Sequence, residues 1–387
     1  MRSWSGAGRA YWCAICFADE LNGRNFGLAT IYDVARVAGV SPKTVSRVLN
    51  GDAPVNDKTR QAVDAAIIEL NYVPSSAART MRSQRSGLVG MITGAISTSP
   101  HFEAAGLPEI YLVQGAQRVL AEHDLTLLIA DTGGRAERVP ELLTTFREHR
   151  VEGILYVAEY HQEVHLPATL GDAKMVLVNC FDRHDTPCVL PDDAGGQFAL
   201  VDALIRRGHD RIGFLTLPEP QAARPLRTAG YLAALEKHGL PFDDRLVIVG
   251  ALSDPAHEYD LLWDALDRLL KVDNPPTVIC CANDKMAMRV YGLLRERGLN
   301  IPGDIGVAGY DNYRMIAEHL HPGLTSAQLP YSAMGARAAE KLMRLISGTT
   351  KPDEPRQELV SGPLAWRNSV EPRVGNIAQL NQRRRET

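Results

Sequence analysis

The sequence predicts an α/β fold in which a small all-α helix-turn-helix headpiece and a short arginine-bearing segment precede a two-lobed core of parallel sheets. Residues 29–73 contain three short helical patterns that carry their own capping residues. From Gly87 onward, strand-like apolar runs alternate with helical patterns. The chain has 387 residues, enough for two lobes with separate apolar cores after a small headpiece.

The first helix of the headpiece is expected to begin after Thr30 and to end at Gly39. The Thr30 hydroxyl can accept a hydrogen bond from a free amide of the first turn, and Asp33 stands where a capping box needs a polar side chain. Apolar residues recur at spacings of three and four: Ile31, Val34, Ala35 and Ala38. Gly39 supplies the left-handed residue that commonly ends a helix.

The second helix is expected after Ser41, which can cap it, with Pro42 at its first position. Its apolar stripe consists of Val45, Val48 and Leu49, and Asn50-Gly51 ends it. A third helix follows from residue 56 to residue 71, with an apolar stripe of Val63, Ala66, Ile67 and Leu70. The three helices are predicted to share one core.

The face of the second helix opposite its apolar stripe is the candidate base-reading surface. Pro42, Lys43 and Arg47 stand there near the helix N-terminus, where a recognition helix contacts base edges in the major groove. The residues expected to contact DNA phosphates are Thr30, Tyr32, Ser41, Thr44 and Asn50. The alternative is that Lys43 and Arg47 only solvate a helix face, but three correctly capped elements in order favour the DNA-reading interpretation.

The stretch from Thr30 to Asn50 resembles the headpiece of the lactose repressor (LacI/GalR) family of transcriptional regulators. Residues 71–82 are similar to the hinge helix of that family, which folds when two subunits meet over the minor groove. The resemblance implies a homodimer on palindromic double-stranded operator DNA. It also assigns these hinge residues to the minor groove: Ala78, Arg79, Met81 and Arg82.

Met81 departs from the family pattern, which usually has Leu at this wedge position. Met can also act as a wedge between base steps, and its flexibility would allow a wider choice of central step. The alternative is that Met81 only packs against its counterpart in the dimer. The hinge segment is too short to be stable as an isolated helix, so dimer contact and DNA would have to supply the free energy that orders it.

The core is expected to contain two α/β lobes. Strands are predicted at 88–92, 125–130, 153–157, 175–179, 211–217, 246–249, 277–281 and 305–310, with helices at 110–122, 139–149, 195–207, 229–238, 259–270, 286–297 and 331–346. The family resemblance implies lobes like those of periplasmic sugar-binding proteins, linked by three crossovers. The first lobe then covers about 87–190 and 325–348, and the second covers 191–324 and 349–370, with a last strand near 357–361 in the second lobe.

The effector site is expected between the lobes, beyond the carboxyl ends of the strands. By resemblance, Arg227 and Asp311 contact the effector, joined by Asn283 and, as a weaker candidate, Asp182. A carboxylate and a guanidinium together suit a polyol, which offers both donors and acceptors, so the expected effector is a sugar. The alternatives left open are that Asp311 is a helix cap and that Asn283 is structural, as it is in part of the family.

The remaining composition is that of a cytoplasmic protein without cofactor or metal. The formal net charge is −4, so DNA affinity must be local, and no apolar run reaches membrane-spanning length. The Cys13–Cys16 pair lacks a second pair at zinc-site spacing, and the other cysteines are expected to be reduced core thiols: Cys180, Cys188, Cys280 and Cys281. Residues 1–28 are expected to be a disordered extension, and the polar chain after Trp366, with 371–387 beyond the core, a disordered tail.

The function predicted from these features is a repressor of a carbohydrate-utilisation operon. Whether the effector releases or promotes DNA binding is not determined by the sequence. An enzyme and a sugar-binding receptor are the alternatives, because a two-lobed core could serve either. No phosphate-binding glycine loop or nucleophile elbow follows a strand, and His161 with His165 lacks a third metal ligand, so this pair is expected on a solvated face.

Overall fold

The computed structural model describes residues 29–51, 54–73, 85–94, 109–166, 173–250 and 258–373. The chain divides into two compact units, 1–84 and 85–387. The predicted hinge residues Ala78, Arg79, Met81 and Arg82 lie outside the described residues. So do the predicted extension 1–28 and the tail beyond residue 373.

The headpiece, residues 29–73, contains the predicted helices α1 (Ile31–Ala38), α2 (Pro42–Asn50) and α3 (Asp57–Glu69). Its buried core consists of Val34, Ala35, Val45, Val63 and Ala66. These residues belong to the three stripes expected from the sequence, so the amphipathic pattern is confirmed. The core is small, and the ends of its helices therefore depend on local capping.

Both caps predicted in the headpiece are present. The Thr30 and Asp33 side chains accept hydrogen bonds from each other's backbone amides, at 3.0 Å for the bond to Asp33 and 3.4 Å for the bond to Thr30, which completes a capping box. Hydrogen bonds from Thr30 and Arg36 lower the pKa of Asp33 to about 2. Ser41 Oγ accepts from the Thr44 amide at 3.1 Å, and Gly39 ends α1 at a φ of 66°.

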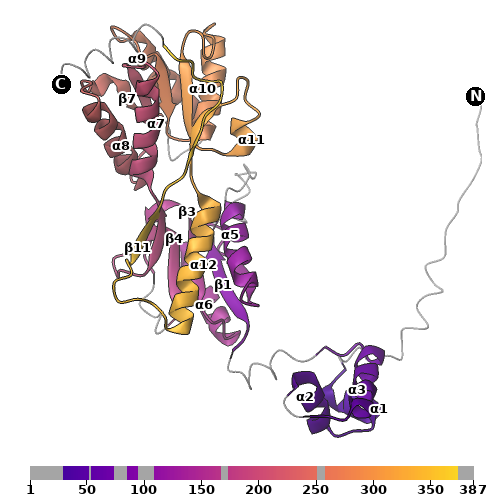
Figure 1. Cartoon of the computed structure of the whole chain (residues 1–387). Coiled ribbons are helices and arrows are strands. Elements are labelled where there is room, and N and C mark those ends of the chain that lie inside the picture. Colours follow the sequence, from indigo (N-terminus) through magenta and orange to yellow (C-terminus); the bar gives the residue numbers. More distant parts are fainter. Residues whose placement is uncertain are drawn as a thin grey trace, which may run out of the picture. The chain divides into compact units, whose positions relative to one another are not determined.

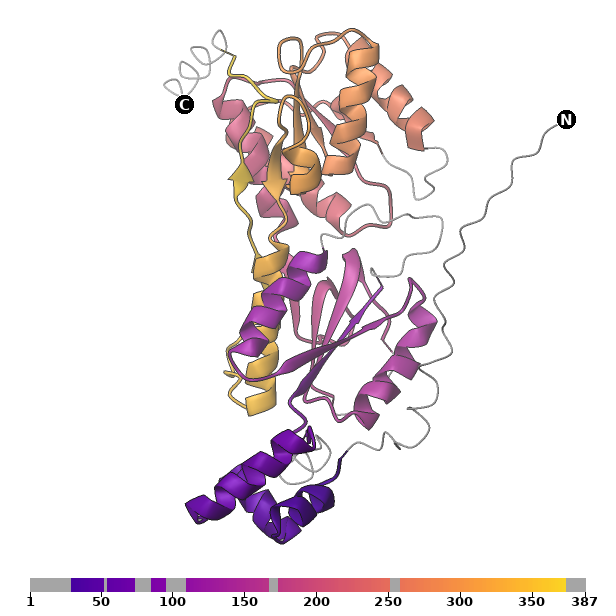
Figure 2. The same ribbon diagram turned by 90° about the vertical axis from the view of Figure 1, so that its right-hand side faces the viewer.

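The first lobe is built on a six-stranded sheet in the order β11-β5-β4-β3-β1-β2, and its described pairings are all parallel. Its strands are β1 (Leu88–Thr93), β2 (Thr126–Asp131), β3 (Ile154–Glu163), β4 (Met175–Phe181), β5 (Cys188–Pro191) and β11 (Gln357–Val360). Its helices are α5 (Glu109–Ala121), α6 (Val139–Glu148) and α12 (Tyr331–Ser347), together with the short η1 (Ala136–Arg138). Figures 1 and 2 show α5 and α12 on one face of this sheet and α6 on the other.

The second lobe contains a six-stranded sheet in the order β12-β10-β9-β8-β6-β7, which is parallel except for β12. Its strands are β6 (Ile212–Thr216), β7 (Val247–Val249), β8 (Val278–Cys281), β9 (Gly306–Asp311), β10 (Thr325–Gln328) and β12 (Leu364–Ala365). Its helices are α7 (Asp193–Arg206), α8 (Ala223–Lys237), η3 (Asp244–Leu246), α9 (Glu258–Lys271), α10 (Asp284–Glu296) and α11 (Arg314–Ala317). The predicted α/β alternation is confirmed.

The lobe assignment near the C-terminus was wrong in two places. The last long strand, β11, pairs with β5 in the first sheet, and the short β12 joins the second sheet instead. Strand β10 belongs to the second lobe, whereas residues 325–348 were all expected in the first. The chain therefore crosses between lobes after β5, β10 and β11, which agrees with three crossovers.

The polar chain after Trp366 also differs from the expectation, because its first residues are packed. Ser369 and Val370 are buried, and Ser369 Oγ accepts a hydrogen bond from the Thr325 amide at 2.8 Å. The Arg373 amide donates to the Arg207 carbonyl at 2.8 Å. The polar residues here complete hydrogen bonds of the second lobe and so extend its fold beyond the predicted boundary.

The remaining compositional predictions concern membranes and thiols. None of the helices in the described ranges combines the length and apolar composition needed to cross a bilayer. Cys180, Cys188, Cys280 and Cys281 are buried free thiols, as predicted. Burial raises the pKa of the Cys188 and Cys280 thiols to about 11 and about 12, respectively, so both are protonated at neutral pH.

Candidate DNA-binding face and effector site

The outward face of α2 presents the predicted base-reading residues. Val45 is fully buried against the headpiece core, whereas Lys43 and Arg47 are exposed on the same helix. Pro42 is the first helical residue and is partly buried. Capping by Ser41 therefore fixes the start of a helix whose exposed face carries two cations, Lys43 in the first turn and Arg47 in the last turn.

The predicted phosphate-contacting residues have different structural surroundings. Tyr32 is 72% exposed, so its ring projects from α1 into solvent. Thr30 and Ser41 cap helices, and the Ser41 and Thr44 hydroxyls lie 2.9 Å apart. The Asn50 amide nitrogen donates to the Ser46 carbonyl. The polar groups other than Tyr32 thus have structural roles in addition to the predicted phosphate contacts.

In the core, Arg227 is buried within a polar cluster of the second lobe. Its side chain lies in the first half of α8 and is only 5% exposed. Its Nε donates to Asp193 Oδ1 at 2.7 Å, and its Nη1 donates to the Ala282 carbonyl. The guanidinium carbon lies 3.7 Å from the centroid of the Tyr310 ring, a cation–π contact.

Asp193 links the two lobes. It is the first residue of α7, and its second carboxylate oxygen lies 2.8 Å from Nδ1 of His161 on β3 of the first lobe. Burial acts to raise the pKa of Asp193, but the charge of Arg227 and the hydrogen bond with His161 outweigh it and lower the pKa. His161 is buried, so the expectation of a solvated face was wrong for this residue.

Asp311 and Asp284 form a second acidic group at the N-terminus of α10. Asp311 ends β9 with a φ of 111° and accepts a hydrogen bond from the Asp284 backbone. Asp284 is fully buried and accepts from Ser326 Oγ and from the Tyr313 amide, both at 2.7 Å. Burial raises the pKa of Asp311 to about 7 although Arg227 lowers it, and burial together with Asp311 raises that of Asp284.

The hydrogen bonds of Asn283 and the position of Asp311 distinguish between their alternative roles. Asn283 caps α10, with its Oδ1 accepting from the Met286 amide at 2.7 Å, which is a structural contact. Asp311 does not cap the helix that follows it, since the residue at the N-cap of α11 is Tyr313. Its carboxylate instead approaches the first turn of α10, where the helix dipole favours an anion.

Asp182, the fourth predicted effector residue, forms a turn in the first lobe. Its carboxylate accepts from the backbone amides of His184 and Thr186, both at 3.0 Å, and from the Thr186 hydroxyl at 2.7 Å. These contacts hold the loop between β4 and β5 and do not connect Asp182 with Arg227 or Asp311. Its role as an effector ligand stays a prediction.

Three residues of the cluster were not predicted as site residues: Asp193, Tyr310 and Asp284. Asp193 was overlooked because α7 was expected to begin at Gly195. The helix begins at Asp193 instead, so this acidic residue belongs to its first turn. Asp284 and Tyr310 are direct neighbours of the predicted Asn283 and Asp311. Only their burial and partners distinguish them, and sequence spacing does not give those.

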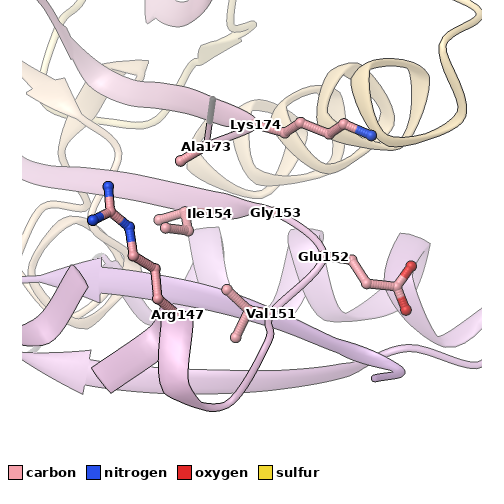
Figure 3. Close-up of a pocket in the computed structure, with 7 residues that line it drawn as sticks. All are labelled: Arg147, Val151, Glu152, Gly153, Ile154, Ala173 and Lys174. Atoms are coloured by element: carbon pink, nitrogen blue, oxygen red, sulfur yellow. The ribbon is translucent and has the colours of Figure 1, made fainter. Parts of the chain in front are cut away.

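A pocket of about 340 Å³ lies elsewhere, at the edge of the first lobe where the chain enters from the headpiece. Figure 3 shows that Arg147, Glu152 and Lys174 line it but do not direct their charged ends toward one point. Glu152 has a structural role here, because it accepts from Arg85 Nε and from the Gly87 amide, both at 2.9 Å. This pocket is therefore separate from the predicted effector residues.

A helix-turn-helix headpiece with an exposed basic face, joined to a two-lobed core with a polar cluster between its lobes, defines a ligand-responsive DNA-binding regulator. Comparison with known proteins identifies the family. The model of bacterial regulatory proteins of the lacI family matches residues 30–75, and that of the periplasmic binding protein-like domain matches residues 201–370. The chain belongs to the LacI family of DNA-binding transcriptional regulators.

Two relatives illustrate the extent of the match. The HTH-type transcriptional repressor PurR of Vibrio atlanticus is 32% identical over 335 residues, covering 82% of this chain and 92% of the relative. The ribose operon repressor of Escherichia coli is 32% identical over 344 residues, covering 87% and 98%.

Two solved structures show the same fold. A transcriptional regulator CelR–cellobiose complex is 29% identical with a TM-score of 0.60, covering 88% of this chain and 99% of that chain. The lac repressor dimer bound to operator and an anti-inducer is 24% identical with a TM-score of 0.73, covering 89% and 99%.

Proposed function

We propose that this protein represses a carbohydrate-utilisation operon by binding a palindromic double-stranded operator as a homodimer, under the control of a sugar-like effector held by the core. The observation that carries the DNA-binding part is the exposed face of α2, where Lys43 and Arg47 stand opposite the buried Val45. The protein would act in the cytoplasm, on the nucleoid.

The base-reading role is tested by fluorescence anisotropy with promoter DNA flanking the protein's own gene. Arg47→Ala should reduce affinity for this DNA by about tenfold or more and change base preference, because a bidentate contact to guanine is lost. Arg60→Ala is a matched control, since it removes the same charge from an exposed position on α3. Equal losses on specific and random DNA for Arg47→Ala would contradict base reading.

The hinge should contribute affinity without base preference. Arg79→Ala is expected to weaken binding to all DNA and to lower the slope of log affinity against log salt by about one. Met81→Ala should reduce operator bending, measured by the mobility of circularly permuted fragments. Unchanged bending would show that Met81 is not a wedge and would favour packing within the dimer.

The homodimer is supported by apolar side chains left exposed on both lobes. They are Ile110 on α5, Ile129 on β2, Met288 on α10 and Met315 on α11, between 37% and 63% exposed. Figures 1 and 2 place α5, α10 and α11 on the same side of the core. Such a surface is expected to be covered by a second subunit. Sedimentation of wild type and of Met315→Glu tests this surface, with the variant shifted toward monomer.

The sugar-like effector is supported by the polar cluster around Arg227 and Asp311. Buried donors and acceptors close together suit a hydroxyl-rich ligand. Two of the similar proteins are named for a carbohydrate: the ribose operon repressor and the CelR–cellobiose complex. Operator binding measured with a panel of mono- and disaccharides tests the proposal. A sugar that weakens or strengthens operator binding would be identified as the effector, and the direction of the change would show whether it releases or promotes DNA binding.

The alternatives are a sugar-binding receptor and an enzyme using the same core. The relatives matched over most of the chain are transcriptional regulators, which favours binding over catalysis. Removal of residues 1–86 distinguishes the first alternative: sugar binding should survive while operator binding disappears. Unchanged recovery of the bound sugar after prolonged incubation with the protein would argue against turnover.

A further inference from the structure

We propose that Asp193 is a specificity-determining residue, which occupies Arg227 as an internal counter-ion and thereby excludes anionic effectors such as sugar phosphates and sugar acids. This inference rests on the proposed effector site and specifies the class of ligand that the site accepts. An effector of this protein would be a hydroxyl-rich molecule without negative charge.

Arg227 is already engaged inside the protein. An arginine that grips a phosphate or carboxylate ligand must present its fork of N–H donors to that ligand. Here Nε donates to Asp193 and Nη1 to the Ala282 carbonyl, while the Tyr310 ring covers one face of the guanidinium plane. The whole residue is only 4% exposed. The guanidinium charge is therefore already neutralised inside the protein, and an anion that approached its remaining N–H donors would have to compete with the carboxylate of Asp193 for that charge.

Asp193 is held in place and stays charged. Its side chain is fully buried, and its two oxygens contact Arg227 at 2.7 Å and His161 at 2.8 Å. The carboxylate therefore contacts a cation on one side and an imidazole from the other lobe on the other side. Rotating it away from Arg227 would leave a buried charge with one partner fewer, which is costly.

The other ionisable side chains around the cluster are mainly acidic. Asp311 lies beside Arg227, and Asp284 interacts with Asp311 and with Arg367. Glu159 of the first lobe interacts with Lys285 of the second. Lys285 also lowers the pKa of Asp311, in addition to the effect of Arg227. Asp311, with a pKa of about 7, is partly ionised at neutral pH, so an added anion would be repelled by its ionised form, whereas a hydroxyl group can donate to that carboxylate.

The test uses inorganic phosphate as a minimal anion and requires no knowledge of the natural effector. Binding is measured by calorimetry on the full chain at constant ionic strength, with chloride as the balancing anion. Wild type should show no saturable phosphate binding that depends on Arg227. Asp193→Asn should bind phosphate about tenfold or more tightly than wild type, because the guanidinium has lost its internal anion. This gain should vanish in Asp193→Asn/Arg227→Met.

Asp192→Asn is the matched control, because it removes a carboxylate one position earlier. Asp192 accepts from the Gly195 amide and from Ser361 Oγ and has no contact with Arg227. It should leave phosphate binding unchanged. Phosphate binding by wild type that Arg227→Met abolishes, or a folded Asp193→Asn that gains no phosphate affinity, would overturn the proposal.

A second measurement keeps Asp193 intact, in case Asp193→Asn does not fold. Wild type is titrated with glucose and galactose, with their 6-phosphates and with glucuronate and galacturonate. Saturable binding of any of the four anions that competes with a neutral sugar would overturn the proposal. Binding of neutral sugars alone would support it. If no sugar binds, the sugar effector of the proposed function fails, and the phosphate experiment still decides the role of Asp193.

Discussion

The buried ion pair between Asp193 and Arg227 should be strongly coupled energetically, and a double-mutant cycle can measure this. Both side chains are nearly inaccessible, at 0% and 5% exposure, and their atoms are 2.7 Å apart. Removing one partner of such a pair leaves an uncompensated buried charge, which costs about 3–5 kcal/mol. Arg227→Met and Asp193→Asn should each lower the free energy of unfolding of the core by about that amount.

The double variant Asp193→Asn/Arg227→Met should be much less destabilised than the sum of the two. It contains neither charge, and the Met thioether can still pack on the Tyr310 ring, a contact worth about 0.3–1.5 kcal/mol. The Ala282 carbonyl loses one donor, which costs about 1 kcal/mol. We therefore expect the double variant to be no more destabilised than either single variant, which corresponds to a coupling energy of about 3 kcal/mol or more between the two positions.

Equilibrium urea unfolding of the full chain, followed by tryptophan fluorescence, is the assay. Trp263 and Trp366 lie in the second lobe, and residues 29–73 contain no tryptophan, so headpiece unfolding should contribute little to the signal. The exposed pair of Arg314 and Glu318, whose side chains are 67% and 38% exposed, is the control cycle and should show far weaker coupling. Additive losses at positions 193 and 227 would refute the reasoning, because independent side chains do not share a buried charge.

The pH dependence of this cycle provides an internal check. The pKa of Asp193 is lower in the folded protein than the ordinary carboxyl value of about 4, so its stabilisation is present above that pH and is lost as the pH falls further. The difference in unfolding free energy between wild type and Asp193→Asn should therefore shrink in acid. A difference that stays constant from neutral pH to about pH 3 would show that Asp193 is not ionised in the folded state.

Three further predictions concern other parts of the chain. The pKa of Asp311 is raised to about 7, so the stability of the folded core falls as the pH rises toward and through that value. Asp311→Asn should therefore stabilise the core at pH 8 by on the order of 1–3 kcal/mol and by much less at pH 5. Urea unfolding at the two pH values measures this difference. Gly230→Ala should destabilise the core by about 2 kcal/mol or more, because the new Cβ would lie 2.2 Å from the Ala194 carbonyl oxygen. Gly292→Ala is the control: its Cβ would meet open space on a helix, and the substitution should stabilise the core by about 0.5–1 kcal/mol. Thr30→Ala should destabilise α1 by about 1 kcal/mol, seen as faster amide exchange in the headpiece; unchanged exchange would show that the capping box does not stabilise α1.

The headpiece could be predicted almost completely because its signals are local. Capping by Thr30 and Ser41, Pro42 at a first helical position and the left-handed Gly39 each act within four residues. A short all-α unit has few long-range pairings, so local propensity and apolar periodicity determine it. The same reasoning gave the alternation of strands and helices in the core.

Strand pairing could not be predicted in the same way. β5 was not expected as a strand, because it has only four residues and includes Pro191, and without β5 the first sheet offered no edge for β11. β11 is itself a partly exposed edge strand whose alternating burial is compatible with either lobe. The choice between two sheets depends on contacts made far along the chain, which periodicity does not encode.

The effector cluster shows a further limit of sequence reasoning, because its main interaction joins residues that the pattern assigns to separate lobes. His161 was interpreted by its spacing to His165, yet its partner is Asp193, 32 positions later and in the other lobe. Burial changes what such a residue does: an exposed histidine is a solvated side chain, whereas this one orients a buried carboxylate. No spacing rule identifies that pairing.

The chain of contacts from His161 through Asp193 to Arg227 also constrains how an effector can act on the lobes. His161 belongs to β3 of the first lobe, whereas Asp193 begins α7 and Arg227 lies on α8 of the second lobe. The hydrogen bond of 2.8 Å between His161 and Asp193 therefore joins the lobes through the carboxylate that neutralises Arg227. A ligand that shifts Arg227 must change the partners of Asp193, and thereby the free energy of the contact between lobes. By linkage, the lobe arrangement that DNA stabilises must change the affinity for that ligand by the same factor.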